Sequence, residues 1–294
     1  MTRHPALWLC AALALICLSC TPRVLRQPPA PVSPAPAPKA TNAVPKILLL
    51  GDSQISFGAG GAYMAFLSTL GAACPDLPDR FARTRPQAIG VRSTALHHWT
   101  ETTAGPARDT ICAVDPTFGV NAGSYGVSGD GLSFVQIGAA DYPYCKAGQT
   151  PLAAAINHHK PDLVVLAFLG NATDRWQKPG QARSDWRAAE RALPPGLPCA
   201  VLTTIPAYDR AENDRRQTAQ ARLATAVDAG GRCSFAPGIT PASRAAIEGD
   251  AANFRTDDSG TVTDPTHPTA ASAARYMAAN RAALCAGLAA ALTE

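Results

Sequence analysis

Two continuous apolar runs constrain the fold of this 294-residue chain more than any other feature. They are Lys46–Leu50, which is apolar after its lysine, and Leu163–Leu169. Both have the length of a strand rather than of a helix. A strand that is apolar at successive positions, instead of at alternate ones, is typical of a parallel sheet covered on both faces.

Helical patterns alternate with strand patterns along the rest of the chain. We expect further strands at 87–91, 200–205 and 232–235, and helices at 55–73, 152–158, 184–193, 211–229 and 269–292. This alternation predicts an α/β fold: a three-layer, doubly wound sandwich with a central, mostly parallel five-stranded sheet over residues 46–294. Residues 100–150 are rich in Gly, Asp, Pro and Tyr and do not fit the alternation, so we expect an insertion near the rim of the site.

The N-terminus has the pattern of a targeting segment. Residues 1–20 contain Arg3 and an apolar stretch too short for a comfortable membrane span. The segment ends in Cys17-Leu-Ser-Cys20, which resembles a bacterial lipoprotein box with Cys20 as the lipidated residue. Cys17 stands where leucine is usual, so the alternative is ordinary signal cleavage and a secreted or periplasmic protein. Residues 21–45, rich in Pro and Ala, predict a semi-rigid tether. We therefore expect a domain anchored by lipid in the bacterial envelope, on the periplasmic face or the outer membrane.

Cysteine usage agrees with such a compartment. Beyond the targeting segment lie six cysteines without Cys-x-x-Cys spacing, which favours disulfides over a metal site. The sequence leaves their connectivity open. The pairs that we propose from chain position are Cys112–Cys145, closing the insertion, and Cys199–Cys233, joining adjacent strand regions.

Charge excludes one class of partner. The chain has 26 Lys and Arg against 22 Asp and Glu, and no Lys/Arg-rich run or basic aromatic stripe. We therefore expect no nucleic-acid partner. The sequence does not indicate an oligomeric state.

Two short motifs at opposite ends of the domain have a chemical meaning together. The first strand runs into Gly51-Asp52-Ser53, and Asp264-Pro-Thr-His267 precedes the last helix. A serine hydroxyl is a weak nucleophile near neutral pH and needs an adjacent base, which in turn needs a third group to orient it. We expect Ser53 to be the nucleophile, His267 the base and Asp264 the group that orients His267.

With Gly170-Asn171 after the mid-chain strand, these motifs resemble those of the SGNH (GDSL-type) hydrolases. The resemblance spans about residues 46–290. It implies an SGNH-like, flavodoxin-like sandwich, a covalent acyl–Ser53 intermediate, and neither metal nor organic cofactor. It also implies an oxyanion hole built from the Ser53 backbone N–H, a loop glycine N–H and an asparagine side chain.

Asn171 matches the asparagine of that oxyanion hole, although Gly170-Asn171-Ala172 departs from the usual Gly-x-Asn-Asp. Two positions compete for the middle donor. Ser93 follows the strand expected at 87–91, where it would replace the glycine and supply the same backbone N–H. Gly129, in Gly126-Val-Ser-Gly129-Asp, is the alternative, on composition. We expect Asp52, Trp99 and Arg175 to contact the substrate, while a packing role is the alternative for Arg175.

These features predict a serine ester hydrolase or acyl-transferring enzyme of the envelope. Location suggests esters of short acyl groups on carbohydrate, with acylated glycan and the anchoring membrane as partners. The alternative is a non-catalytic carbohydrate-binding lipoprotein on the same fold, for which the altered Gly-Asn motif argues. The two hypotheses differ in where they place His267 relative to Ser53.

Overall fold

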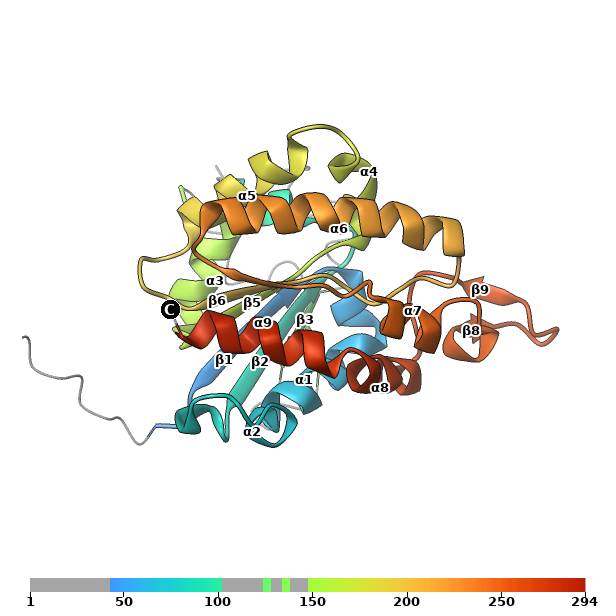
Figure 1. The fold of residues 1–294 in the computed structure, drawn as a ribbon, viewed down its shortest axis with the longest axis horizontal. Helices are drawn as coiled ribbons and strands as arrows, with labels where there is room; N and C mark the ends of the chain where they lie inside the picture. The colour runs from blue at the N-terminus through green and yellow to red at the C-terminus, as the bar shows by residue number, and fades with distance from the viewer. Residues whose placement is uncertain (1–42, 102–123, 128–133, 138–147, 294) are drawn as a thin grey trace, which may run out of the picture. The chain divides into compact units, whose positions relative to one another are not determined.

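A seven-stranded sheet organises the part of the chain that the structure describes (Figure 1). The structure is a computed structural model, and it describes residues 43–101, 124–127, 134–137 and 148–293. The strand order is β4-β3-β2-β1-β5-β6-β7. These strands are β1 (Lys46–Gly51), β2 (Arg85–Val91), β3 (Ser124–Val127), β4 (Phe134–Ile137), β5 (Leu163–Ala167), β6 (Cys199–Leu202) and β7 (Ser234–Ala236).

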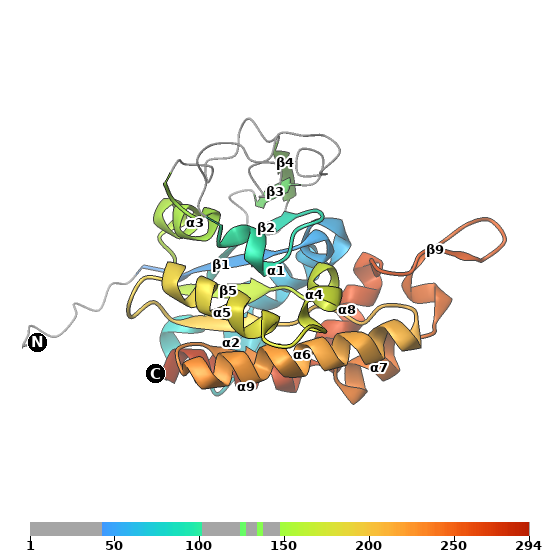
Figure 2. The ribbon, with the colours of Figure 1, turned by 90° about the horizontal axis from the view of Figure 1, so that it is seen from above.

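Five neighbouring strands of this sheet are parallel. β1 pairs with β2 on one side and β5 on the other, and β6 and β7 continue beyond β5. The expected five-stranded parallel core is therefore confirmed, with the crossover order of a doubly wound sheet. β3 and β4 are antiparallel and extend the sheet beyond β2 (Figure 2). Both come from residues 100–150, the segment that we expect to be an insertion.

Helices cover both faces of the sheet (Figure 1). One face carries α3 (Pro151–His159), α5 (Gln181–Ala192) and α6 (Arg210–Gly230). The other carries α1 (Gly60–Ser68), α2 (Leu70–Ala73), α7 (Pro241–Ile247), α8 (Ala270–Ala279) and α9 (Arg281–Thr293).

Strand β1 shows why an all-apolar strand suits this arrangement. Its side chains alternate between the two faces of the sheet. Leu48 and Leu50 belong to the core under α3, α5 and α6, whereas Ile47 and Leu49 belong to the core under α1, α8 and α9. The predicted three-layer sandwich is thus confirmed.

Shorter elements occupy the loops. α4 (Thr173–Trp176) follows a 3₁₀ turn at Gly170–Ala172, and further 3₁₀ turns lie at Asp79–Phe81, Leu96–Trp99 and Ala251–Asn253. β8 (Arg255–Thr256) and β9 (Val262–Asp264) form a separate antiparallel pair.

Two expected helices are broken. The helix expected over 55–73 begins as a π-helical turn, Ile55–Ala59, and continues as α1 and α2. The helix expected over 269–292 is divided at Asn280 into α8 and α9. The Asn280 side chain donates to the Pro237 carbonyl at 2.8 Å, a polar contact that hydrophobic periodicity does not reveal. The strands expected at 163–169 and 200–205 end earlier, at Ala167 and Leu202, where the chain leaves the sheet.

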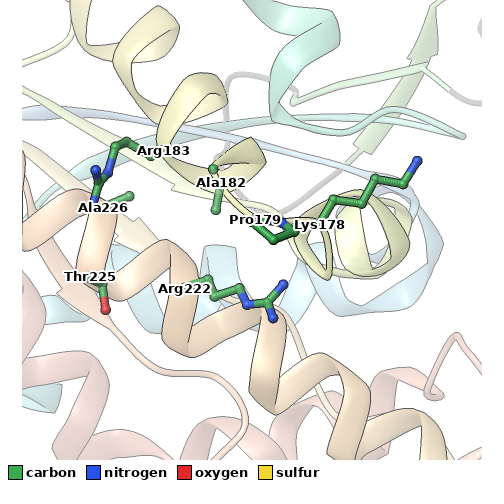
Figure 3. Close-up of a pocket in the computed structure, with 8 residues that line it drawn as sticks. Lys178, Pro179, Ala182, Arg183, Arg222, Thr225 and Ala226 are labelled. Carbon is green, nitrogen blue, oxygen red and sulfur yellow. The ribbon is translucent and has the colours of Figure 1, made fainter.

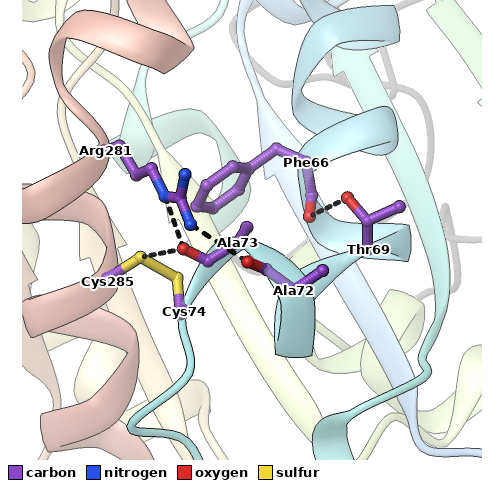
Figure 4. Close-up of a disulfide and its surroundings, with 7 residues drawn as sticks. All are labelled: Phe66, Thr69, Ala72, Ala73, Cys74, Arg281 and Cys285. Carbon is purple, nitrogen blue, oxygen red and sulfur yellow. Dashed lines mark hydrogen bonds between the residues drawn. A yellow bond between two sulfur atoms is a disulfide. The ribbon is translucent and has the colours of Figure 1, made fainter.

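Two disulfides link elements of the sandwich within the described residues. Cys199–Cys233, an expected pair, joins the starts of β6 and β7 with 4.8 Å between the Cα atoms. Cys74–Cys285 was not expected, and it connects the end of α2 to α9 (Figure 4). The proposed pair Cys112–Cys145 lies outside the described residues. Disulfides in this domain are consistent with an oxidising, extracytoplasmic compartment.

Arg281 reinforces the second of these junctions. It donates to the carbonyls of Ala73 at 2.5 Å and Ala72 at 3.0 Å, which lie at the C-terminal end of α2 (Figure 4). A cation at a helix C-terminus satisfies carbonyls that have no partner within the helix. Among the helices of the described residues, the structure has none whose length and apolar content would let it cross a membrane.

Candidate active site

Ser53 lies where β1 turns into the π-helical turn that precedes α1. Its Oγ is near the carboxyl ends of the parallel strands, the edge at which such sheets bind ligands. Two glycines allow the turn to press against this edge. A Cβ on Gly51 would lie 2.3 Å from Cγ1 of Ile55, and a Cβ on Gly90 would lie 2.5 Å from the backbone nitrogen of Ser56. The close packing of the turn against β1 and β2 therefore depends on the absence of both side chains.

His267 and Asp264 approach Ser53 from the other end of the chain. Nε2 of His267 lies 2.9 Å from Oγ of Ser53, across 214 residues of sequence. Nδ1 of His267 lies 3.0 Å from each carboxylate oxygen of Asp264. The structure thus brings the three residues into one hydrogen-bonded chain, in the order that proton transfer from a serine hydroxyl requires.

The backbone around Asp264 fixes its carboxylate. Oδ1 accepts the backbone N–H of His267 at 3.1 Å and that of Thr266 at 3.2 Å. Arg255 on β8 places Nη2 3.5 Å from the second oxygen. Burial acts to raise the pKa of Asp264, but the charge of His267 and these hydrogen bonds outweigh it and hold the pKa below its ordinary value. Asp264 is therefore ionised near neutral pH.

The pKa of His267 is shifted in the same direction as that of Asp264, and for an imidazole this favours the uncharged form. Burial lowers the pKa of His267 below its ordinary value, even though Asp264 attracts the protonated form. Arg255 and Arg216 disfavour the imidazolium further by like charge. At neutral pH the imidazole is therefore neutral, which a group that accepts the Ser53 proton must be.

Gln54 holds the histidine loop against the nucleophile turn. Its side-chain nitrogen donates to the carbonyls of Thr266 at 3.0 Å and Ile205 at 3.2 Å. Its oxygen accepts the Ile205 N–H at 2.8 Å. The residue after Ser53 therefore connects the end of the β6 region to the residue before His267.

Asp52, the residue before Ser53, faces the interior and not the substrate side, so its expected role as a substrate contact is wrong. The residue is 1 % exposed, and its carboxylate accepts the N–H of Gln54 at 2.9 Å. Burial raises its pKa to about 6, against the opposing effects of that hydrogen bond, of the Arg216 charge and of the Leu169 N–H. Asp52 is thus a buried, hydrogen-bonded carboxyl directly before the nucleophile.

Arg216 is a buried charge near the site. It comes from α6, is 2 % exposed and donates through Nε to Glu212 at 2.8 Å. Its Nη1 donates to the Ile205 carbonyl at 3.4 Å. A Cβ on Gly170 would lie 3.5 Å from Nη2 of Arg216 and 4.0 Å from Oδ2 of Asp52. Gly170 therefore packs against both buried charged groups, and a Cβ at this position would meet them in ordinary contact.

The candidate oxyanion residues lie on two neighbouring loops. The side chain of Asn171 is exposed and donates to the Thr94 carbonyl at 2.9 Å, so it joins the turn after β5 to the turn after β2. Ser93 has a backbone φ of 59°, in the left-handed region that glycine adopts more readily than other residues. Gly129, the competing position, lies outside the described residues. The oxyanion roles of Ser53, Ser93 and Asn171 stay predictions.

Trp99 and Arg175 are the other two residues that we expect to contact the substrate, and both have partners within the protein. Trp99 is completely buried and packs edge-on against Phe168 with 6.2 Å between the ring centroids. Arg175 donates through two nitrogens to Asp185, at 2.7 and 2.8 Å, and Trp176 donates to the same carboxylate. Trp99 is therefore a core residue, which corrects its expected substrate contact, whereas the substrate contact expected of Arg175 stays a prediction.

Sequence reasoning missed Gln54 and Arg216. The position of Gln54 next to the nucleophile is a signal that could have identified it. No local pattern distinguishes Arg216 from the other arginines of α6. Within the described ranges, no group of three or more His, Cys, Asp or Glu side chains could hold a metal ion.

Comparisons with known proteins find likeness in structure alone. No protein-family model matches the sequence, and no curated protein matches it. A DUF4886 family protein from Bacteroides uniformis is 13 % identical, with a TM-score of 0.46 over 82 % of this chain and 82 % of its own. A carbohydrate esterase family 3 protein from Talaromyces cellulolyticus is 14 % identical, with a TM-score of 0.41 over 81 % of this chain and 95 % of its own.

A salicylyl-acyltransferase from a tetracycline biosynthetic pathway, SsfX3, is 12 % identical. Its TM-score is 0.38, over 84 % of this chain and 55 % of its own. At such identities and TM-scores the likeness decides nothing about chemistry.

Proposed function

We propose that this chain is a serine ester hydrolase of the SGNH type. The observation that carries the proposal is the 2.9 Å contact between Nε2 of His267 and Oγ of Ser53, continued by Asp264 behind the imidazole. A histidine in a surface loop has no reason to meet a serine 214 residues away with this orientation. The lowered pKa of His267 supports the same role, because it keeps the base unprotonated.

In the proposed reaction, Ser53 attacks an ester carbonyl while its proton passes to His267. The imidazolium, held by Asp264, then protonates the departing alcohol, and an acyl–Ser53 ester is left. Water attacks this ester, returns its proton through His267 and releases the carboxylic acid. An acceptor alcohol in place of water would give acyl transfer.

The negative charge of each tetrahedral intermediate needs fixed donors. We assign the backbone N–H groups of Ser53 and Ser93 and the side-chain amide of Asn171. The left-handed backbone at Ser93 supports this position over Gly129, since the family expectation is a glycine there. The Asn171 amide has two hydrogens, so its contact with the Thr94 carbonyl leaves one for the substrate oxygen.

We place this activity in the bacterial envelope, with lipid on Cys20 and residues 21–45 as the tether. The lipoprotein-like sequence and the disulfides of the domain support that location. Short acyl esters on envelope carbohydrate are the substrates that a tethered enzyme would meet there.

Hydrolysis of p-nitrophenyl acetate by the wild-type chain and by Ser53→Ala tests the chemistry. We expect the variant to lose at least about 10³-fold in kcat/KM, as expected for removal of a nucleophile. Ser68→Ala, which removes an exposed hydroxyl on α1, is the matched control and should retain the wild-type rate. Covalent labelling of the wild type, but not of Ser53→Ala, by a fluorophosphonate gives a second readout.

Equal rates in wild type and Ser53→Ala would refute the hydrolase. The exposed Asn171 and its altered motif would then favour the binding hypothesis. That hypothesis is tested by measuring whether the folded chain binds acetylated glycan without deacetylating it.

A further inference from the structure

A groove between α5 and α6 lies apart from the residues discussed so far. It consists of two adjoining hollows, of about 340 and 380 Å³, and no member of the Ser53, Asp264 and His267 group lines either. Arg183 and Ala226 line both hollows, which makes the groove continuous. Figure 3 shows the first hollow, with Arg183 on α5, Arg222 on α6 and Lys178 in the turn before α5.

The walls of this groove are strongly cationic. Four basic side chains line the two hollows against a single acidic one, and these are Lys178, Arg183, Arg187 and Arg222, with Glu190 as the acid. Within the described chain, Lys178, Arg183 and Arg187 form no ion pair. By contrast, the nearby Arg175 forms an ion pair with Asp185. The groove thus holds cations that the protein itself does not neutralise.

Backbone geometry adds to the positive potential. α5 begins after Gly180 without a side-chain cap and without an acidic residue in its first turn. The positive end of a helix dipole therefore points at the first hollow. Arg222 is fixed beside it, because its Nη1 donates to the carbonyl of Trp176 at 2.8 Å and also to that of Gln177. Its remaining N–H groups are left to meet a ligand.

A buried indole supplies the second, independent observation. Trp186 lines the larger hollow and is completely buried, and its Nε1 has no hydrogen-bond partner among the described residues. By contrast, Nε1 of Trp176 donates to Asp185 at 2.9 Å. A Cβ on Gly230 would lie 2.8 Å from Nε1 of Trp186 and 2.5 Å from Oε1 of Glu190, so the indole and the acid of the same hollow both lie beside Gly230. A buried donor without a partner is costly, and an acceptor in the hollow would remove this cost.

We propose that the α5–α6 groove binds an acidic carbohydrate, one that carries carboxylate or phosphate groups along its chain. Arg183 and Arg187 are one helical turn apart, which separates their starting points by about 6 Å and lets them hold two charged groups. Hydroxyl or ring oxygens would accept the Trp186 indole N–H. A flat membrane surface would contact the exposed arginines without entering the hollow that Trp186 lines.

The proposal does not rest on the hydrolase activity. It assigns a contact with anionic glycan to a groove that neither Ser53 nor Asp264 nor His267 lines. Ser53→Ala is therefore expected to bind the probe as the wild type does, so that failure of one proposal leaves the other standing.

Fluorescence anisotropy with labelled hexagalacturonate, titrated with the full-length chain at low salt, tests the groove. We expect Arg187→Ala to weaken binding about tenfold, as for one charge-assisted hydrogen bond. Arg191→Ala is the matched control, because it removes the same charge from an exposed position of the same helix but lines neither hollow. It should change affinity less than twofold. Glu190→Gln should strengthen binding, since it removes the opposing charge.

A second readout follows the indole directly. The chain has four tryptophans, so the indole N–H signals in a ¹⁵N spectrum are few, and Trp186→Phe assigns the relevant one. Hexagalacturonate should shift this signal, whereas a neutral hexasaccharide should not.

Equal losses from Arg187→Ala and Arg191→Ala would overturn the groove in favour of diffuse surface charge. An unmoved Trp186 signal would overturn the role of the hollow. Binding to phosphatidylglycerol vesicles that depends on Arg187, with no binding of hexagalacturonate, would replace the carbohydrate by a lipid surface.

Discussion

Substitution of Asp52 by asparagine measures how much the ionisation of a buried carboxyl next to the nucleophile lowers the free energy of unfolding. Burial raises the pKa of Asp52 from 3.8 to about 6. Since a tenfold change in an equilibrium constant corresponds to about 1.4 kcal/mol, this shift represents about 3 kcal/mol between the protonated and the ionised folded protein. Asparagine has nearly the same shape and keeps an oxygen to accept the Gln54 N–H, but it does not titrate.

The sign of the pH dependence follows from the direction of the shift. The folded-state pKa lies above the unfolded value, so the folded protein holds this proton more strongly than the unfolded chain does. The resulting stabilisation is fully present below about pH 3.8 and is lost as the pH rises through about 6. We therefore expect the free energy of unfolding of the wild type to fall by about 3 kcal/mol relative to Asp52→Asn between roughly pH 4 and pH 7.

Arg216 does not disturb this comparison, because it keeps its ion pair with Glu212 in the variant. A guanidinium remains protonated throughout this range, and its attraction for the ionised Asp52 is already contained in the net raised pKa of that carboxyl. Urea unfolding followed by tryptophan fluorescence at several pH values measures the difference. Asp228→Asn, at an exposed position, is the control. Its free energy of unfolding relative to wild type should not change comparably with pH. If the free energies of unfolding of wild type and Asp52→Asn differed by the same amount from pH 4 to pH 7, the reasoning would be refuted.

Three other substitutions follow from the structure. Asp264→Asn should lower kcat by about 10³- to 10⁴-fold, because the imidazole loses its orienting carboxylate; a rate within tenfold of wild type, with the thermal midpoint preserved, would contradict this. Gly90→Ala should cost about 1–3 kcal/mol in urea unfolding and reduce kcat, because the new methyl group meets the backbone of the nucleophile turn. Gly61→Ala, where a Cβ meets nothing within 4 Å, is its control and should be neutral or stabilising. Cys285→Ala should destabilise by about 2–4 kcal/mol, because Cys74 is then no longer linked across 211 residues; an unchanged urea midpoint would show that the linkage does not stabilise the domain.

The parallel core could be predicted from the sequence because its signal is local. Leu163–Ala167 is buried at each position, and a strand of this kind can only lie between two covered faces. The ends of elements are less predictable, since they depend on partners elsewhere in the chain. Asn280 divides the last helical stretch through a carbonyl at Pro237, and nothing near position 280 reveals that contact.

The site could be predicted only in part, for a related physical reason. Ser53, Asp264 and His267 lie in motifs whose chemistry is readable, and the structure brings them together. Arg216 lies on a helix rich in charged side chains, and only tertiary packing decides which of them is buried. Trp99 follows the predicted oxyanion position Ser93 closely in sequence, which favours a substrate contact. A tryptophan carries a large apolar area, and burial of that area in the core prevails over its proximity in sequence.

The two neighbours of Ser53 explain how the nucleophile keeps its position relative to His267, which lies far away in sequence. Asp52 faces inward to the Gly170 turn, while Gln54 binds Ile205 and Thr266 on the side of the histidine loop. The nucleophile is thus held through polar groups directly before and after it, and apolar packing of the turn alone would not fix its distance to the histidine. Such contacts are directional, so their loss should displace Ser53 from its base before it unfolds the sandwich. Substitutions at these two neighbours should therefore reduce kcat more than their effect on stability alone would account for.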